Sequence, residues 1–362
     1  MDAMSFDSDG ALAFVGSYAP ADRPGIHAVL VTNTGDLHHL SSWSGVHNPS
    51  FLRRHPRGGS LYVVGETGLA TEGIPGAVHA FRVDEGTGNV DLVLLNSRTT
   101  SGDHPCHIGV DAEGTRLAVS NYGSGTAAVF PIRPDGSLAE MASFAQHTGT
   151  GPNPDRQEGP HVHSSCFTPD GRFLIVVDLG IDRMMVYRID REGASLHLEH
   201  EVHTAPGAGP RHTVFHPDGR HLFVVNELDN TITLFGYRAE DGSLVPVQTL
   251  STLPEGVFQS IAADIHLSPT GHHVYVSNRG HDSLTVYEFD RVRGLALTAI
   301  RTCGGRHPRG FALTPDGNHV LVANRSSDEV VSIPLSNGPA DIGVPTARIP
   351  IPEPSCVTVT NN

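Results

Sequence analysis

Residues 209–227 read GPRHTVFHPDGRHLFVVNE, two short apolar runs on either side of a Pro-Asp-Gly turn. Apolar runs bounded by turn residues predict strands, and two runs joined by an Asp-Gly turn predict a β-hairpin. A hairpin reverses the chain direction once, so its polar start (Arg211, His212) lies beside its polar finish (Asn226, Glu227). The sequence therefore predicts a polar cluster at one end of this hairpin.

The turn and the run that follows it recur seven times along the chain. The turn glycines stand 46 to 57 residues apart, at Gly10, Gly58, Gly114, Gly171, Gly219, Gly271 and Gly317. A repeat of this length matches one blade of a β-propeller. The apolar runs are continuous rather than alternating, which is typical of strands buried on both faces. We therefore predict an all-β fold, a seven-bladed β-propeller with four-stranded antiparallel blades.

The first copy of the repeat lacks the strand that precedes the turn in the other copies. The segment EPSCVTV (353–359) near the C-terminus resembles that strand in its residue pattern. We expect this C-terminal strand to join the N-terminal blade, which closes the ring and removes its open sheet edges. The whole chain, residues 1–362, is then expected to form a single propeller domain.

Composition excludes several classes of partner. The formal net charge of −15 at pH 7 argues against binding to nucleic acid or to an anionic membrane surface. No apolar run is long enough to span a membrane as a helix. The four cysteines form no Cys-x-x-Cys pair, so neither a zinc site nor a redox motif is indicated. The acidic start MDAMSFDSDG lacks the apolar segment of a secretory signal, so we expect a cytoplasmic protein.

One rim of the predicted channel collects the polar residues. Innermost strands start there, second strands end there, and the long loops 66–76 and 145–160 fall there too. The strand starts carry His161, His163, Arg211, His212, His307 and Arg309, and the strand ends carry Tyr18, Glu66, Asn121, Tyr122, Asp178, Glu227, Arg279 and Arg325.

This set of side chains permits a specific chemistry. A carboxylate or a neutral imidazole can take a proton from water, and arginine can hold an anion or stabilise an oxyanion. The chain has no Gly-x-Ser-x-Gly elbow and no evident Cys-His pair, so covalent acyl catalysis is not indicated. Water attack on a lactone or ester, assisted by a base, fits best. A salt-bridge lock between blades is the structural alternative for Arg211, Glu227 and Arg279. Turn capping is the alternative for Asn278 and Asn324, backbone binding for Asp178, and simple solvation for Glu66.

Several stretches of the sequence also resemble a known family. They include GSYAP, NPSFLRRHP, HPCHIGVD, RQEGPHVH, GPRHTVFHPDG with VVNE, VSNRGHDS and HPRGFALTPDG. The resemblance covers nearly the full chain. It is to the lactonase family of seven-bladed propellers, which contains the propeller-type 6-phosphogluconolactonases and the fungal carboxy-cis,cis-muconate cyclase. It implies that His161 or His163, Arg211, Glu227 and Arg279 form the active site.

The resemblance implies two reactions, hydrolysis of 6-phosphoglucono-1,5-lactone and closure of a muconate to a muconolactone. We favour the hydrolase of the pentose phosphate pathway, acting on a small anionic substrate without a cofactor or metal. Glu227 or His163 would activate water, and Arg211 and Arg279 would hold the phosphate or the oxyanion. The residues expected to contact the substrate are Asn121, Tyr122, Gln157, Asp178 and Arg309.

Two other functions remain open at the level of sequence. One is a metal-dependent lactonase that holds a divalent cation with Glu66, Asn121, Asp178 and Asn226. The other is a propeller that only binds partners, for which an exposed apolar patch on a rim would be expected. Asp264 is a small departure from the family pattern, because we expect a glutamate at this place in its innermost strand.

Overall fold

A computed structural model describes residues 10–86, 89–190, 195–335, 338 and 340–360 of the 362-residue chain. The N-terminal segment that carries the expectation about a secretory signal lies mostly outside these residues. In the described part of the chain, no helix combines the length and the apolar character needed to cross a membrane.

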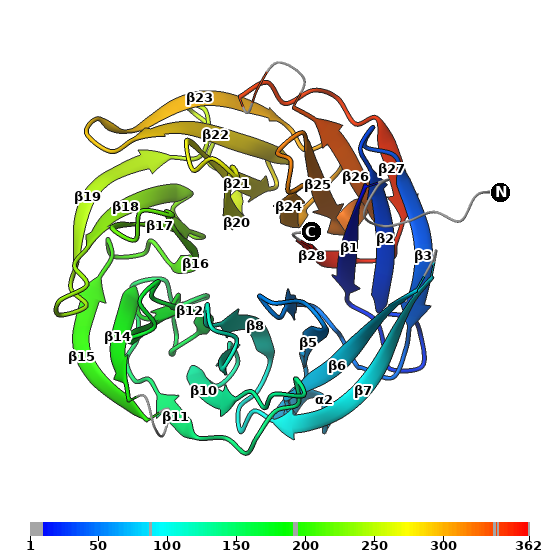
Figure 1. Ribbon diagram of the computed structural model, residues 1–362. Helices are drawn as coiled ribbons and strands as arrows, with labels where there is room; N and C mark the ends of the chain where they lie inside the picture. The colour runs from blue at the N-terminus through cyan, green and yellow to red at the C-terminus, as the bar shows by residue number, and fades with distance from the viewer. Residues whose placement is uncertain (1–9, 87–88, 191–194, 336–337, 339, 361–362) are drawn as a thin grey trace.

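The strands form seven sheets of four strands each, arranged as blades around a central channel (Figure 1). Blade 1 contains β28 (Pro354–Val359), β1 (Gly10–Ser17), β2 (Ile26–Thr32) and β3 (Leu37–Trp43); blade 2 contains β4 (Leu52–Arg54), β5 (Ser60–Gly65), β6 (Ala77–Gly86) and β7 (Asn89–Thr99); blade 3 contains β8 (Pro105–Val110), β9 (Arg116–Asn121), β10 (Thr126–Pro131) and β11 (Ser143–Gln146). Blade 4 contains β12 (Val162–Phe167), β13 (Phe173–Asp178), β14 (Arg183–Ile189) and β15 (Leu196–His203); blade 5 contains β16 (Pro210–Phe215), β17 (His221–Asn226), β18 (Thr231–Tyr237) and β19 (Leu244–Ser251). Blade 6 contains β20 (Ile261–Leu267), β21 (His273–Arg279), β22 (Ser283–Asp290) and β23 (Gly294–Thr302); blade 7 contains β24 (Pro308–Leu313), β25 (His319–Asn324), β26 (Glu329–Pro334) and β27 (Ala347–Pro350). Two short helices, α2 (Leu69–Glu72) and η1 (Arg325–Ser327), lie in loops. The predicted fold class is confirmed.

The ring closes as the sequence predicts. Strand β28 is the innermost strand of blade 1 and pairs antiparallel with β1, with Val357 opposite Val15. The hydroxyl of Ser355 donates to the carbonyl of Gly16 at 3.1 Å and to that of Ser50, in the neighbouring blade, at 2.8 Å. The C-terminal strand therefore completes blade 1 and ties it to blade 2.

The core lies between neighbouring blades rather than within any one of them. Every residue of β13 is buried, and its side chains pack in two separate clusters, one on each face of the sheet. One cluster packs Phe173 and Ile175 of β13 against Leu222 and Val224 of β17 in blade 5. Burial on both faces explains why the apolar runs are continuous in the sequence.

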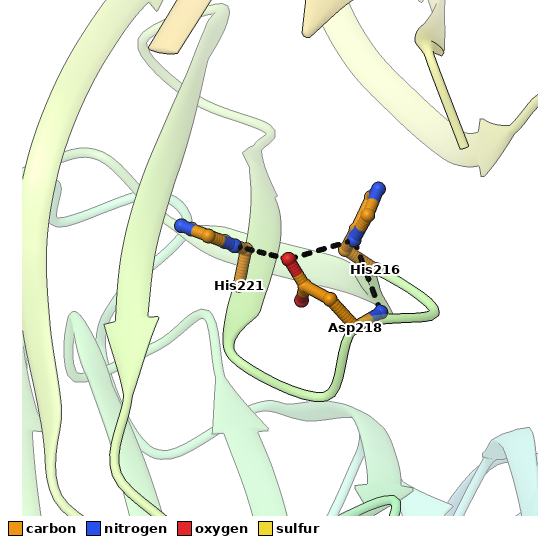
Figure 2. Close-up of side chains that lie close together, drawn as sticks. All are labelled: His216, Asp218 and His221. Carbon is orange, nitrogen blue, oxygen red and sulfur yellow. Dashed lines mark hydrogen bonds and ion pairs between the residues drawn. The ribbon is translucent and has the colours of Figure 1, made fainter. Parts of the chain in front are cut away.

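The Pro-Asp-Gly turns occupy the face of the ring opposite the polar strand ends. In blade 5 this turn connects β16 to β17 and carries His216, Asp218 and His221 (Figure 2). Gly219 adopts the left-handed conformation with φ of +66°, which a side chain would strain. The hairpin therefore sends both of its polar ends, Arg211 and Glu227, to the other face.

Candidate active site

A bulge at the start of the innermost strand recurs from blade to blade. In β16, Pro210 pairs with Asn226 and His212 pairs with Val225, so Arg211 has no cross-strand partner. The same shift leaves His163 unpaired in β12 and Arg309 unpaired in β24. A bulge redirects a side chain relative to the regular alternation of a strand. These bulged residues are brought together at the polar end of the channel.

Glu227 lies at the centre of this group, directly after β17. Its carboxylate is almost fully buried and meets three arginines. Oε2 lies 2.9 Å from Nε of Arg211 and 2.7 Å from Nη2 of Arg279, and Oε1 lies 2.5 Å from Nη2 of Arg156. Burial by itself would raise the pKa of Glu227, but the three positive charges outweigh it and hold this pKa well below its ordinary range.

Two of the three arginines are fixed by blade 6 as well as by Glu227. Arg211 donates from Nη1 to the carbonyl oxygen of Ala263, and Arg279 donates from Nη2 to that of Ala262 at 2.8 Å. Burial and the proximity of Arg279 lower the pKa of Arg211 to about 10, so this side chain stays protonated at neutral pH. The structure thus contains the inter-blade ion pairs that we considered as the structural alternative, and they occupy the candidate active site.

Arg156 is the residue that our sequence reasoning missed. It belongs to the loop 145–160, which we expected at this rim, and its side chain is 35% exposed. Besides Glu227 it reaches the hydroxyl of Tyr122 at 3.5 Å. Its signal in the sequence was the RQEG segment within the RQEGPHVH stretch, but a loop carries no periodicity that would orient a side chain.

The two candidate histidines differ in their contacts. Both ring nitrogens of His161 are engaged, Nδ1 with the carbonyl oxygen of Tyr122 at 3.0 Å and Nε2 with Glu158 at 3.1 Å. The ring of His161 also stacks on the ring of Tyr122, with centroids 4.4 Å apart. His161 is therefore held in place from several sides.

His163 lies deeper in the channel and has weaker polar contacts. Its Nε2 is 4.0 Å from Oε2 of Glu227, too far for a hydrogen bond, and its Nδ1 is 3.8 Å from Sγ of Cys106. Burial and the positive charge of Arg211 lower the pKa of His163 well below its ordinary value. The ring is thus neutral at physiological pH and has a lone pair available as a proton acceptor.

Arg309 is a further cation at this site. Among the described residues it forms no ion pair, the charges of Glu66 and Glu227 act on it from farther away, and its guanidinium packs 5.3 Å from the ring centroid of Tyr18. The nearby Glu66 accepts hydrogen bonds from the hydroxyls of Tyr18 and Ser50. Glu66 is therefore tied to protein donors and is not simply solvated, which corrects one of our alternatives.

Three residues that we expected to contact the substrate point elsewhere. Asn121, Gln157 and Asp178 are completely buried. Asn121 donates to the hydroxyl of Thr126 in the next strand at 2.9 Å, and Gln157 donates to the carbonyl oxygen of Leu179 and to Asp182, both at 2.8 Å. These side chains hold strands and loops in place, because a buried amide needs internal partners.

Asp178 follows the alternative that we gave for it. One oxygen accepts from the backbone amides of His161 at 2.7 Å and Gly180 at 3.0 Å, and the other is 2.7 Å from Nδ1 of His147. Asp178 therefore positions the start of the innermost strand. Of the five expected substrate contacts, Tyr122 and Arg309 remain at the site.

Two of the four residues considered for a divalent cation, Asn121 and Asn226, form hydrogen bonds within their own blades. Asn226 donates to the hydroxyls of Thr231 and Thr233 within its own blade, as Asn121 does to Thr126 in blade 3. Asn278 likewise bonds Ser283 and Thr285, which is the structural role that we considered for it. The asparagines at the strand ends thus link the second strand of a blade to the third.

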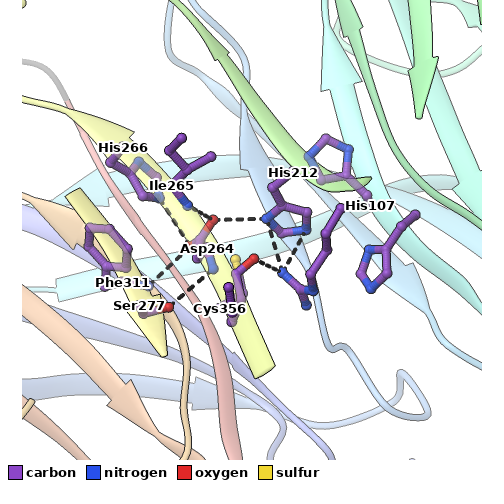
Figure 3. A network of polar contacts seen from close by, with 12 residues as sticks. His107, His212, Asp264, Ile265, His266, Ser277, Phe311 and Cys356 are labelled. Carbon is purple, nitrogen blue, oxygen red and sulfur yellow. Dashed lines mark hydrogen bonds and ion pairs between the residues drawn. The ribbon is translucent and has the colours of Figure 1, made fainter. Parts of the chain in front are cut away.

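Asp264 and the two histidines His212 and His266 form a polar cluster (Figure 3). His212 Nδ1 is 2.8 Å from Oδ1 of Asp264, and His266 Nε2 is 3.1 Å from Oδ2. A cavity of about 680 Å³ is lined by this cluster together with His107, Arg53 and the turn residues Pro269 and Pro315. Asp264 is therefore paired with two histidines inside the channel and does not lie at the rim. The candidate active site lies at the polar rim.

Known proteins resemble this chain over nearly its whole length. The family model described as lactonase, 7-bladed β-propeller, matches residues 12–359. A 6-phosphogluconolactonase of Bacillus subtilis (strain 168) is 32% identical over 350 residues, which cover 96% of this chain and 97% of that protein. A 6-phosphogluconolactonase of Formosa agariphila is 34% identical over 309 residues, covering 83% and 85% of the two chains.

A solved structure shows the same likeness in three dimensions. The periplasmic gluconolactonase of Pseudomonas aeruginosa matches with a TM-score of 0.88 at 32% identity, covering 97% of this chain and 99% of that one. The match in sequence and the match in fold both include all seven blades. The chain belongs to the lactonase family of seven-bladed β-propellers.

Proposed function

We propose that this protein hydrolyses a phosphorylated sugar lactone of the 6-phosphoglucono-1,5-lactone type. The names of the two relatives support the substrate class. One observation carries the assignment of roles: Glu227 is saturated by three arginines, whereas the ring nitrogens of His163 have only long contacts, 3.8 Å to Cys106 and 4.0 Å to Glu227.

His163 is the better candidate for the base. Glu227 is a poor proton acceptor because protonation would leave buried arginines without a counter-charge. The imidazole of His163 takes a proton from water while the water oxygen attacks the lactone carbonyl carbon. The bond from that carbon to the ring oxygen then breaks, and the imidazolium returns the proton to the ring oxygen.

Glu227 acts through the arginines that it holds. It fixes the forks of Arg211 and Arg279 beside His163, where they stabilise the negative charge that develops on the carbonyl oxygen. These cations are oriented before substrate arrives, so they need no reorganisation during the reaction. Tyr122 stacks on His161 and forms the wall of the site next to Arg156.

Arg309 and Arg156 are suited to bind the substrate phosphate. Arg309 forms no ion pair among the described residues, and Arg156 is the exposed member of the three arginines around Glu227. A guanidinium offers a planar fork that matches phosphate oxygens. Burial lowers the pKa of Arg279, and the positive charges of Arg309 and Arg156 lower it further, so both arginines lie near it.

The test is a set of parallel assays on the purified protein. Hydrolysis of 6-phosphogluconolactone is compared with that of unphosphorylated gluconolactone and with cyclisation of carboxymuconate, each with and without chelator. We expect turnover of the phosphorylated lactone, slower turnover of the unphosphorylated one, no cyclisation and no effect of chelator. If the wild type and a His163→Gln variant hydrolyse 6-phosphogluconolactone at the same rate, the proposal is refuted.

A further inference from the structure

The turn between β16 and β17 places two histidines and an aspartate on one side of the hairpin (Figure 2). The backbone amide of His216 donates to the carbonyl oxygen of His221 at 2.9 Å, so these residues face each other across the last pair of the hairpin. One ring nitrogen of His216, one of His221 and one carboxylate oxygen of Asp218 all lie within 4.8 Å of one another. The turn lies on the face opposite the candidate active site.

The three side chains are held in this arrangement before any ligand binds. The rings of His216 and His221 both pack edge-on against Phe289, with centroids 5.0 and 5.1 Å away. Oδ1 of Asp218 accepts a hydrogen bond from the backbone amide of Arg220 at 2.8 Å. The other oxygen, Oδ2, is left to point between the two imidazoles.

Nδ1 of His216 has two polar neighbours in Asp218. Nδ1 of His216 accepts a hydrogen bond from the backbone amide of Asp218 at 3.1 Å, so this nitrogen carries a lone pair. Oδ2 of Asp218 lies at the same distance, 3.1 Å, from the same nitrogen. A cation bound between this nitrogen and Oδ2 would take the imidazole lone pair in place of the amide hydrogen bond.

The equivalent turns of other blades carry different residues at these positions. In blades 4 and 7 the first turn position is a threonine, whose hydroxyl donates to the turn aspartate at 2.6 Å (Thr168 to Asp170, Thr314 to Asp316). In blade 5 a histidine takes that place, and a second histidine stands at the sixth position. Among the described turns, only this one combines both imidazoles with the carboxylate.

The distances suit a zinc-type ion. Tetrahedral ligands at ~2.0–2.1 Å from Zn²⁺ are about 3.3 Å apart, and Oδ2 of Asp218 lies 3.1 Å from Nδ1 of His216 and 2.8 Å from Nδ1 of His221. Oδ2 also lies 3.3 Å from Nε of Arg291, but this arginine is 67% exposed and free to withdraw. We propose that His216, Asp218 and His221 bind a zinc-type divalent cation, with water at the fourth position.

The test uses tag-free protein stripped with chelator and titrated with ZnCl₂ by calorimetry. We expect one Zn²⁺ per chain in a site that weakens more than about 100-fold in His216→Thr, since losing a ligand costs more than losing its supporting residue. This variant recreates the Thr-Asp pair of blades 4 and 7, so the hairpin should stay folded. Co²⁺ bound to the wild type should show the d–d absorption of a tetrahedral site.

His273→Gln is the matched control, because it removes a histidine from the sixth position of the blade 6 turn, where Thr270 replaces the aspartate. This variant should bind Zn²⁺ like the wild type. Equal Zn²⁺ binding by the wild type and His216→Thr, or no stoichiometric binding by the wild type, would overturn the proposal and leave an ion-pair cluster only. If His216→Thr unfolds, Asp218→Asn replaces it in the same comparison.

Discussion

Arg211 and Glu227 form a buried ion pair, with Nε of the arginine 2.9 Å from Oε2 of the glutamate. The first lies at the start of β16 and the second directly after β17, at the two ends of one hairpin. Each side chain is only 2% exposed. Because a buried charge is stable only with its partner, this pair links the stability of the propeller to the chemistry of its channel.

We expect Glu227→Gln to destabilise the protein by about 3–5 kcal/mol, because Arg211 and Arg279 then remain buried without a counter-charge. Urea unfolding at pH 7 measures the change. The control is Glu158→Gln, the same chemical change at a side chain that is 61% exposed, which should cost less than about 1 kcal/mol. Equal losses in the two variants would contradict the role given to Glu227.

We expect His163→Gln to lower kcat about 10²–10⁴-fold while KM changes little, because a general base acts in the transition state. Steady-state lactone hydrolysis, corrected for the spontaneous reaction, provides the measurement. His161→Gln serves as the comparison, since both nitrogens of His161 are already bonded. If His161→Gln shows the larger loss in kcat, the two histidines have been assigned the wrong way round.

We expect Arg309→Met to raise KM for the phosphorylated lactone about 10–100-fold, the value of one or two charge-assisted hydrogen bonds. KM for unphosphorylated gluconolactone should stay the same, because that substrate offers no anion to this arginine. The ratio of the two KM values is therefore the readout. An equal rise for both lactones would indicate that Arg309 shapes the site without binding phosphate.

We expect stability to fall as the pH drops from 6.5 to about 4. Burial lowers the pKa of His212 from 6.5 to about 4, and the pKa values of His27 and His79 shift in the same direction. Over this range the unfolded chain binds protons that the folded chain cannot, so the stability present above pH 6.5 is lost on acidification. For His212 the loss is at most about 3 kcal/mol.

Thermal unfolding between pH 7.5 and pH 4 checks this expectation, with chelator present to exclude metal effects. A His27→Gln variant should show a shallower loss of stability with acidification, by the contribution of one histidine. A melting temperature that stays constant down to pH 4.5 would show that these histidines are protonated in the folded state.

The sequence by itself determined the architecture. Turn glycines at a near-constant spacing and continuous apolar runs are local features, and each blade repeats them. The number of blades, the ring closure by residues 353–359 and the location of Arg211 and Glu227 at one rim all followed from counting strands and their directions.

Only the tertiary structure decided which rim residues meet. The bulges that free Arg211, His163 and Arg309 depend on pairing between strands, and Arg156 reaches Glu227 from a loop of another blade. Asn121, Gln157 and Asp178, expected to contact the substrate, are buried and form their hydrogen bonds with other protein groups. Side-chain direction and burial arise from contacts between distant parts of the chain, which no local pattern contains.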